Sequence, residues 1–236
     1  MKNIVSTIVA ISALSIPVTL QASEWGYTGH SGPEHWKGLC QSGVNQSPID
    51  ISNTIESELS PIKFNYGSSG QYVVNNGHTI QVNIDGKHTI QVEGKTFNLL
   101  QFHFHTPSEN LIKGHSYPLE MHLVHADEDN NLAVVGVMLE EGAESEAIEK
   151  VWSAMPKSTG KSRMQYPVKL NKLLPQDQNY YRFNGSLTTP PCSEGVTWLV
   201  MKNPISISPE QLKTFKTIYS GNNRPVQKLN ARPVLD

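Results

Sequence analysis

The chain has 236 residues, of which 37% are hydrophobic and 17% charged, and its formal net charge is −2. This globular composition excludes a disordered, collagen-like or coiled-coil protein, and the near-neutral charge argues against nucleic acid as a partner, which usually needs a basic face. The length fits one large β-rich or α/β domain, or two small ones.

The first predicted element, residues 1–22, has the pattern of an export signal. Lys2 precedes an apolar stretch from Ile4 to Leu20, and the segment ends at the small residue Ala22. The alternative is a membrane anchor, but polar residues and a proline interrupt the stretch, which is shorter than the roughly 20 apolar residues that span a bilayer. We therefore expect a periplasmic or secreted protein whose mature chain, residues 23–236, has no membrane segment.

The next elements are short runs rich in Val, Ile and Thr, the clearest at residues 71–74, 78–84 and 87–92. Asp85-Gly86 separates the last two runs, and this dipeptide is a strong hairpin signal because both turn positions tolerate positive φ. The pentapeptide His-Thr-Ile-Gln-Val occurs in both runs, but no third copy follows. We therefore interpret them as the two arms of one hairpin.

Further strands are predicted at residues 97–105 and 119–126, with 132–139 as the hairpin partner of the second. Helical patterns are scarce. They cover residues 143–155 and a segment that runs to residue 219 from Ser208, an N-cap followed by proline. No linker divides the chain, so the sequence predicts a mostly β (α+β) single domain with a few peripheral helices.

Two cysteines, Cys40 and Cys192, follow the export signal. An even number of cysteines in an exported chain suggests a disulfide bond, since an oxidising compartment makes an exposed free thiol a liability. Two buried thiols or a reactive pair remain the alternatives.

Five of the nine histidines lie between residues 103 and 125. Strand alternation places two sets of side chains each on one face: Gln101, His103 and His105, and Glu120, His122 and Val124. Three neutral nitrogen ligands with an open fourth position are typical of catalytic zinc, whereas structural zinc usually closes its shell with cysteine. Gln101 and Glu120 are suited to accept the second N–H of a ligating histidine. The alternative is simply a polar face of a sheet. His125, on the opposite face, is expected to be a core histidine.

These histidine motifs resemble the zinc-binding signature of the α-class carbonic anhydrases. The similarity extends over nearly the whole mature chain and includes Trp25-Gly26-Tyr27, Gly32-Pro33-Glu34-His35-Trp36, Asn45-Gln46-Ser47-Pro48-Ile49, Asn76-Gly77-His78, Gly185-Ser186-Leu187-Thr188-Thr189-Pro190-Pro191-Cys192 and Asn223-Arg224-Pro225. The stretch at residues 106–109 and the exported setting resemble the bacterial periplasmic members.

The resemblance implies a large, mainly antiparallel twisted central sheet with short peripheral helices, and a zinc lyase that reversibly hydrates CO₂ to bicarbonate and a proton by attack of zinc-bound hydroxide. The site residues that it implies are Zn²⁺ ligands His103, His105 and His122; Thr188, which orients the hydroxide, with Glu109 as its acceptor; the proton shuttle His78; the substrate pocket of Val124, Val134, Leu187, Thr189 and Trp198; and the disulfide Cys40–Cys192. It also implies inhibition by sulfonamides and small anions, and a possible homodimer. Asn110 departs from the histidine that is common after the glutamate, which affects the tuning around the ligands.

Two other functions remain open from the residues alone. A zinc hydrolase or esterase would use the same metal site, although the absence of a helical His-Glu-x-x-His motif disfavours a metalloprotease. A β-rich binding module with structural zinc is the other alternative, and the open fourth position argues against it.

Overall fold

The computed structural model describes residues 25–236. The predicted export signal and its cleavage site lie outside the described residues. Between residues 25 and 236, no helix is long and apolar enough to cross a membrane.

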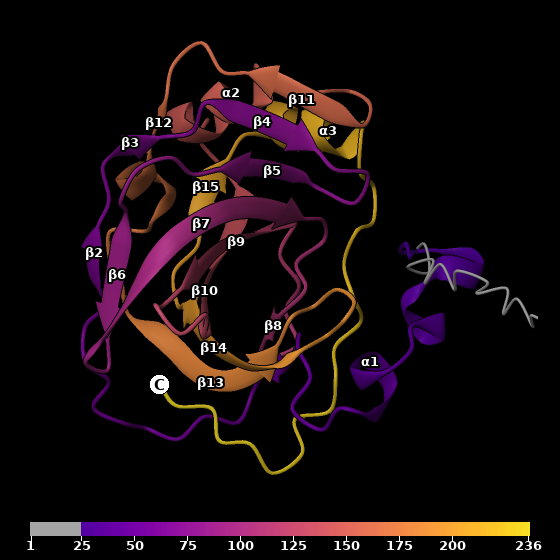
Figure 1. Cartoon of the computed structure of the whole chain (residues 1–236), viewed down its shortest axis with the longest axis vertical. Helices are drawn as coiled ribbons and strands as arrows, with labels where there is room; N and C mark the ends of the chain where they lie inside the picture. The colour runs from indigo at the N-terminus through magenta and orange to yellow at the C-terminus, as the bar shows by residue number, and fades with distance from the viewer. Residues whose placement is uncertain (1–24) are drawn as a thin grey trace, which may run out of the picture.

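A large twisted sheet forms the centre of the molecule (Figure 1). Its main path has the order β11-β4-β5-β7-β9-β10-β14-β13, with β2, β6 and β15 attached to it. Most pairs are antiparallel, and the parallel pairs within it are β10 with β14 and β10 with β15. The predicted fold class is therefore confirmed.

The strands are β1 (Asp50–Ile51), β2 (Lys63–Asn65), β3 (Ser68–Ser69), β4 (Tyr72–Asn75), β5 (Ile80–Asn83), β6 (Thr89–Val92), β7 (Lys95–His105), β8 (Leu111–Ile112), β9 (Leu119–Ala126), β10 (Leu132–Glu141), β11 (Gly160–Arg163), β12 (Val168–Lys169), β13 (Tyr180–Ser186), β14 (Glu194–Met201) and β15 (Ile205–Ile207).

The predicted hairpin between residues 78–84 and 87–92 is wrong. The two runs do form β5 and β6, but these strands do not pair with each other; both pair with β7, β5 at residues 101–103 and β6 at residues 95–98. Because β7 has eleven residues, it accommodates both four-residue strands end to end along one edge. β6 instead forms its hairpin with β7, through the positive-φ pair Glu93 and Gly94.

The hairpin of β9 and β10 forms as predicted, in continuous register from Ala126–Leu132 to Leu119–Leu139. The helices are short and peripheral: α1 (Leu39–Ser42), α2 (Glu146–Trp152), α3 (Pro209–Lys216), and the 3₁₀ turns η1 (Gly29–Ser31), η2 (Pro33–His35) and η3 (Leu170–Leu173). The two predicted helices exist but are shorter than expected. α2 begins only after its N-cap Ser145, α3 begins after the predicted N-cap Ser208, and both end before the predicted residues, at Trp152 and Lys216.

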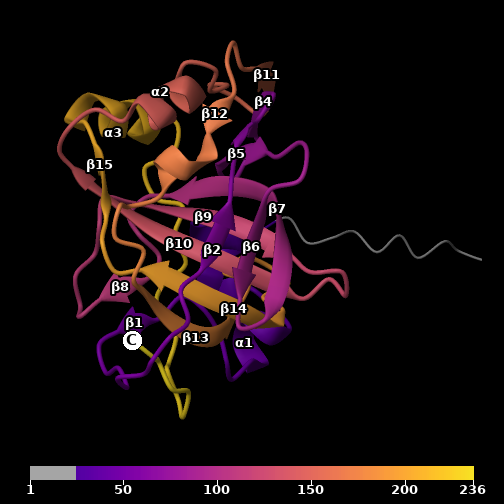
Figure 2. The same ribbon diagram turned by 90° about the vertical axis from the view of Figure 1, so that its left-hand side faces the viewer.

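The sheet separates two apolar clusters. One face carries the larger cluster, in which Phe104 packs against Trp152 of α2 and Phe215 of α3, with ring centroids 4.7 and 6.1 Å apart. Figures 1 and 2 show α2 and α3 side by side on this part of the molecule. The opposite face carries a smaller cluster around Val134 and Trp198. Alternation along β7 and β9 therefore leaves the predicted metal ligands on the face that the two helices do not cover.

Candidate active site

Three histidines from two neighbouring strands converge on one point. In the antiparallel pair β7–β9, His103 lies directly opposite His122, and His105 lies opposite Glu120. One ring nitrogen of each of His103, His105 and His122 lies within 4.8 Å of the others. No other group of three such side chains occurs in the part of the chain that the structure describes. The predicted ligands are therefore brought together.

A different acceptor orients each imidazole ring. His103 Nδ1 lies 2.8 Å from Gln101 Oε1, and His105 Nδ1 lies 2.7 Å from the carbonyl oxygen of Asn222. His122 instead presents Nε2 to Glu120, 2.9 Å from Oε1. The acceptors beside His103 and His105 each take up one ring N–H, and this fixes the tautomer that leaves Nε2 available as a ligand atom. The Glu120 carboxylate beside His122 Nε2 favours the tautomer that leaves Nδ1.

The donor set fits a metal ion such as zinc. His105 Nε2 is buried and has no hydrogen-bond partner among residues 25–236, a costly state that a metal bond would relieve. Burial, followed by the neighbouring histidines, holds the pKa of His103 well below its usual value, and burial also lowers the pKa of His105. The neutral imidazole, which is the form that binds a metal, therefore predominates at neutral pH.

Glu120 is fixed more rigidly than the sequence indicated. Its Oε2 accepts 2.8 Å hydrogen bonds from the backbone nitrogens of Glu109 and Asn110, and its Oε1 accepts one of 2.8 Å from Asn110 Nδ2. Burial alone would raise the pKa of Glu120, but His122 and these hydrogen bonds outweigh it, so the net shift is downward. Gly136 lies opposite His122, and a Cβ there would approach Glu120 Oε1 to 3.1 Å.

Glu109 lies just behind the ligands. Its Oε1 accepts a 2.7 Å hydrogen bond from the backbone nitrogen of Arg224, and its two oxygens lie 3.5 Å from His105 Nδ1 and 3.9 Å from His122 Nδ1. Burial raises the pKa of Glu109 to about 7, although His122, the Arg224 backbone and the hydroxyl of Thr188 favour the ionised form. Thr188, itself buried, is thus in contact with this carboxyl group.

Three of the five predicted pocket residues form one row across three strands. Val124 of β9 lies opposite Val134 of β10, which lies beside Trp198 of β14. The Trp198 ring meets His122 edge-on at 4.9 Å, and its Nε1 donates to the carbonyl oxygen of Ser186. Leu187 packs against the same cluster, while Thr189 is half-buried in the adjoining loop. An apolar wall therefore borders the histidines.

His78 lies in the turn between β4 and β5. Its backbone nitrogen donates a 2.9 Å hydrogen bond to Asn76 Oδ1. Its imidazole ring stacks on Trp25, with ring centroids 3.7 Å apart and planes inclined by 10°. The half-buried ring is therefore packed against the indole of Trp25, a contact that was not predicted from the sequence.

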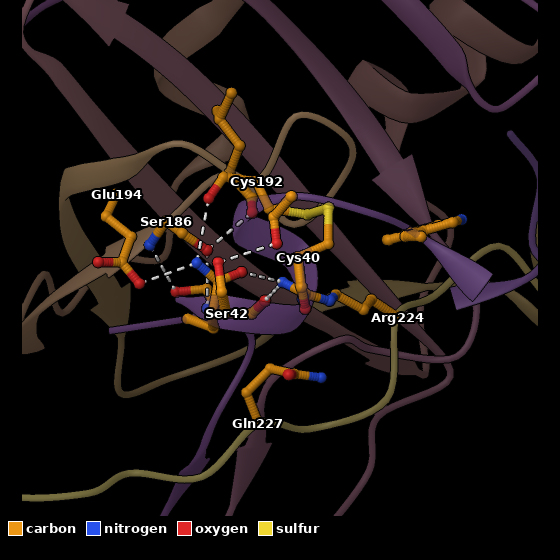
Figure 3. The surroundings of a disulfide bond; sticks show 12 residues. Cys40, Ser42, Ser186, Cys192, Glu194, Arg224 and Gln227 are labelled. Atoms are coloured by element: carbon orange, nitrogen blue, oxygen red, sulfur yellow. Dashed lines mark hydrogen bonds between the residues drawn. A yellow bond between two sulfur atoms is a disulfide. The ribbon is translucent and has the colours of Figure 1, made fainter. Parts of the chain in front are cut away.

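A disulfide joins Cys40 of α1 to Cys192, four residues after Thr188 (Figure 3). Gln46 Nε2 donates to the carbonyl oxygen of Cys192 and to Glu194 Oε1, and the Arg224 guanidinium donates to the carbonyl oxygen of Cys40 over 2.8 Å. The predicted pairing is confirmed in the structure, where it connects the amino-terminal segment to the Thr188 loop.

Three residues of the site had no role assigned to them from the sequence. Asn222 holds His105, Asn110 holds Glu120, and Arg224 holds Glu109. Asn110 was visible only as a departure from the family pattern, and Arg224 only as part of a matching motif. A cavity of about 910 Å³ lies between Glu56 and Asp236, but no histidine lines it, so its size alone does not make it the active site.

Comparisons with known proteins agree with this geometry. A family model described as eukaryotic-type carbonic anhydrase matches residues 31–236. The carbonic anhydrase of Neisseria gonorrhoeae is 46% identical over 97% of this chain and 94% of its own. That of Klebsiella pneumoniae is 47% identical over 96% of this chain and 97% of its own.

Solved structures give the same result. The α-carbonic anhydrase of Thermovibrio ammonificans, in complex with the inhibitor sulfanilamide, has a TM-score of 0.88 and 48% identity, covering 90% of this chain and 99% of that one. The Photobacterium profundum α-carbonic anhydrase has a TM-score of 0.88 and 49% identity, covering 90% of this chain and all of that one. With the family match over residues 31–236, these similarities show that the chain belongs to the eukaryotic-type (α-class) carbonic anhydrases, enzymes whose general reaction is the hydration of CO₂.

Proposed function

We propose that this enzyme reversibly hydrates CO₂ to bicarbonate and a proton with a zinc ion held by His103, His105 and His122. The observation that carries the proposal is the convergence of these three nitrogens, one of which, His105 Nε2, is buried without a hydrogen bond. Imidazole nitrogens suit zinc, and both cysteines are committed to the disulfide, so thiolate is not a competing ligand. When bound, zinc supplies a Lewis acid that makes a hydroxide nucleophile available at a pH of about 7.

The surrounding acceptors keep the ligands correctly aimed. Gln101 and the Asn222 carbonyl direct Nε2 of His103 and His105 into the site, whereas Glu120 takes Nε2 of His122 and leaves Nδ1 for the ion. Replacing such a hydrogen-bond partner of a metal ligand usually lowers metal affinity or activity 10- to 100-fold, which corresponds to about 1.4–2.7 kcal/mol.

Thr188 and Glu109 would orient the attacking oxygen. A hydroxyl has one proton to donate, and when Glu109 is ionised its contact with Thr188 would commit the Thr188 proton to that carboxylate. The Thr188 oxygen can then act only as an acceptor toward the site. The nucleophile is thereby directed toward the apolar wall of Val124, Val134, Leu187 and Trp198, with Thr189 at its edge, where the apolar CO₂ would rest.

His78 would carry the proton from the site to solvent. Histidine is the side chain whose ordinary pKa lies closest to neutrality, so it can accept a proton and release it again to buffer. His78 is half-buried on a turn, and Asn222 joins its backbone to Phe104, next to His105; this supports a group close to the ligand strand that also has access to solvent.

The setting of the enzyme is part of the same proposal. Residues 1–22 would direct export to the periplasm or the medium, and the catalytic domain would comprise residues 23–236, with a disulfide suited to an oxidising compartment. Because a similar structure holds sulfanilamide, we expect inhibition by sulfonamides and by small anions. We also propose a homodimer with no nucleic-acid partner.

Stopped-flow measurement of CO₂ hydration, before and after removal of metal with a chelator, tests the proposal. We expect activity to disappear with the metal and to return on addition of one equivalent of zinc. Undiminished hydration by verified metal-free protein would refute it, and hydrolysis of esters without hydration of CO₂ would favour a zinc esterase.

A further inference from the structure

The turn that carries His78 is docked on the end of β7 by a buried side chain, Asn222. Asn222 Nδ2 donates to the carbonyl oxygens of His78 and Phe104 over 3.0 and 2.9 Å. Its Oδ1 accepts a 2.8 Å hydrogen bond from the backbone nitrogen of Thr106. Asn222 therefore contacts both residues that flank His105 and the backbone of His78 at once.

Thr79 makes a second connection between the same two segments. Its hydroxyl group donates to the carbonyl oxygen of Phe104 over 2.5 Å and lies 3.3 Å from the Phe104 backbone nitrogen, which donates back to it. Thr79 is buried, with 6% of its surface exposed. The turn is thus attached to the strand of the metal ligands on either side of the His78–Thr79 peptide.

Asn222 holds the His78 turn at a set distance from the end of β7, because its side-chain amide is planar and both Nδ2 and Oδ1 are hydrogen-bonded. Asn222 is only 1% exposed, so each of its polar atoms loses free energy unless it keeps its protein partner. A shift of the His78 turn would break the bond to its carbonyl oxygen, and water cannot easily replace that bond at a buried site. The position of the His78 backbone relative to His105 is therefore held by the hydrogen bonds of two buried side chains, Asn222 and Thr79.

We propose that Asn222 and Thr79 are positioning residues for proton transfer, which hold the His78 turn against the strand that carries His103 and His105. This inference rests on the proposed shuttle role of His78. In that step one proton moves from the site to a neutral imidazole nitrogen of His78 and then to a buffer base, and no other bond changes. Since hydration of CO₂ precedes the step, misplacing His78 slows regeneration of the enzyme and not the attack on CO₂.

The test compares Asn222→Ala and Thr79→Val with a matched control, Asn223→Ala. Asn223 is the adjacent asparagine, and its side chain makes no hydrogen bond to any residue between 25 and 236. In weak buffer we expect kcat to fall about tenfold in both test variants, less than the roughly 100-fold (about 2.7 kcal/mol) that a displacement of about 1 Å can cost. In Thr79→Val, kcat/KM and zinc content should stay close to those of the parent. Added imidazole should restore kcat in both test variants, and Asn223→Ala should behave as the parent.

Two further measurements separate this inference from the shuttle role itself. In a His78→Ala background, Asn222→Ala and Thr79→Val should cause no additional loss of kcat, because both act through the missing imidazole. The backbone amides of residues 75–80 should exchange hydrogen faster in both variants than in the parent, and this measurement does not depend on enzyme activity. If His78→Ala leaves kcat unchanged in weak buffer, the shuttle role fails.

If His78→Ala lowers kcat but Thr79→Val and Asn222→Ala do not, the positioning role fails while the shuttle role stands. An equal fall in kcat and kcat/KM, with no rescue by imidazole, would also overturn it, because that pattern indicates general damage to the site. Should Asn222→Ala fail to fold or lose zinc, Thr79→Val decides by the same measurements.

Discussion

The backbone nitrogen of Arg224 donates a 2.7 Å hydrogen bond to Oε1 of Glu109. The guanidinium group of the same residue, which is 2% exposed, donates to Gln46 Oε1 and to the carbonyl oxygens of Ser47 and Cys40 at 2.7–2.9 Å. One residue therefore connects the carboxyl group behind the metal ligands with the segment that carries the disulfide. Figure 3 shows Arg224 beside Cys40.

Arg224→Met should reduce the free energy of unfolding by about 3 kcal/mol or more, because it removes the donors from three acceptors in a buried region at about 1 kcal/mol or more each. Urea denaturation measures the change. Arg182→Met is the matched control: Arg182 forms a surface ion pair with Glu93, 2.9 Å apart, and its loss should cost about 1 kcal/mol or less. Equal destabilisation by the two substitutions would contradict the structural role of Arg224.

His122→Ala and His125→Ala should separate the metal site from the core. His122 contributes one of the three converging nitrogens, so its replacement should abolish stoichiometric zinc and CO₂ hydration. His125 lies on the opposite face, fully buried, and its replacement should leave zinc bound but destabilise the fold. Metal analysis after dialysis and unfolding curves distinguish the two. Loss of zinc from His125→Ala alone would show that the wrong histidine was assigned.

The buried His125 should make stability depend on pH. Its Nδ1 donates to the carbonyl oxygen of Ala133, and its Nε2 accepts from the hydroxyl of Tyr66, so the neutral ring is satisfied. Burial lowers the pKa of His125 to about 4, against an ordinary value of 6.5. Below pH 6.5 the unfolded chain binds a proton that the folded protein refuses, so this contribution is complete above pH 6.5 and is lost as the pH falls through about 4.

The loss amounts to about 3 kcal/mol, from about 1.4 kcal/mol for each unit of pKa difference. His125→Gln removes the titrating group, so its free energy of unfolding should fall less than that of the parent between about pH 7.5 and about pH 4.5. Urea denaturation at the two pH values gives the difference. Parallel pH profiles for the parent and His125→Gln would show that His125 is not the source.

The ligand face was predictable because it depends on alternation within single strands. β7 and β9 begin and end within two residues of the predicted runs, so His103, His105 and His122 share a face as expected. The partner of a strand depends on distant residues, and this is why the local Asp85-Gly86 signal misassigned β5 and β6. Asn222 contacts His105 across 117 positions, and no sequence period relates them.

The disulfide should stabilise the fold and the Thr188 loop by separate routes. Cys40 and Cys192 are 152 positions apart, and closing so long a loop stabilises by about 5 kcal/mol through the entropy of the unfolded chain. Next to the bridge, Cys192 N donates to the carbonyl oxygen of Thr189, and Leu187 N donates to that of Ser193, so the loop is closed on itself. Mass spectrometry of the exported protein should detect no free thiol.

Replacing both cysteines by alanine should therefore lower the free energy of unfolding by about 5 kcal/mol. The three histidines lie on β7 and β9, away from the bridge in sequence and held by their own acceptors, so zinc should remain stoichiometric. Thr188 lies only four residues from Cys192, so kcat/KM should fall while the metal stays bound. Loss of zinc together with activity would mean that the bridge supports the ligand strands themselves. Unchanged kcat/KM would mean that the backbone hydrogen bonds of residues 187–193 suffice to hold Thr188 without it.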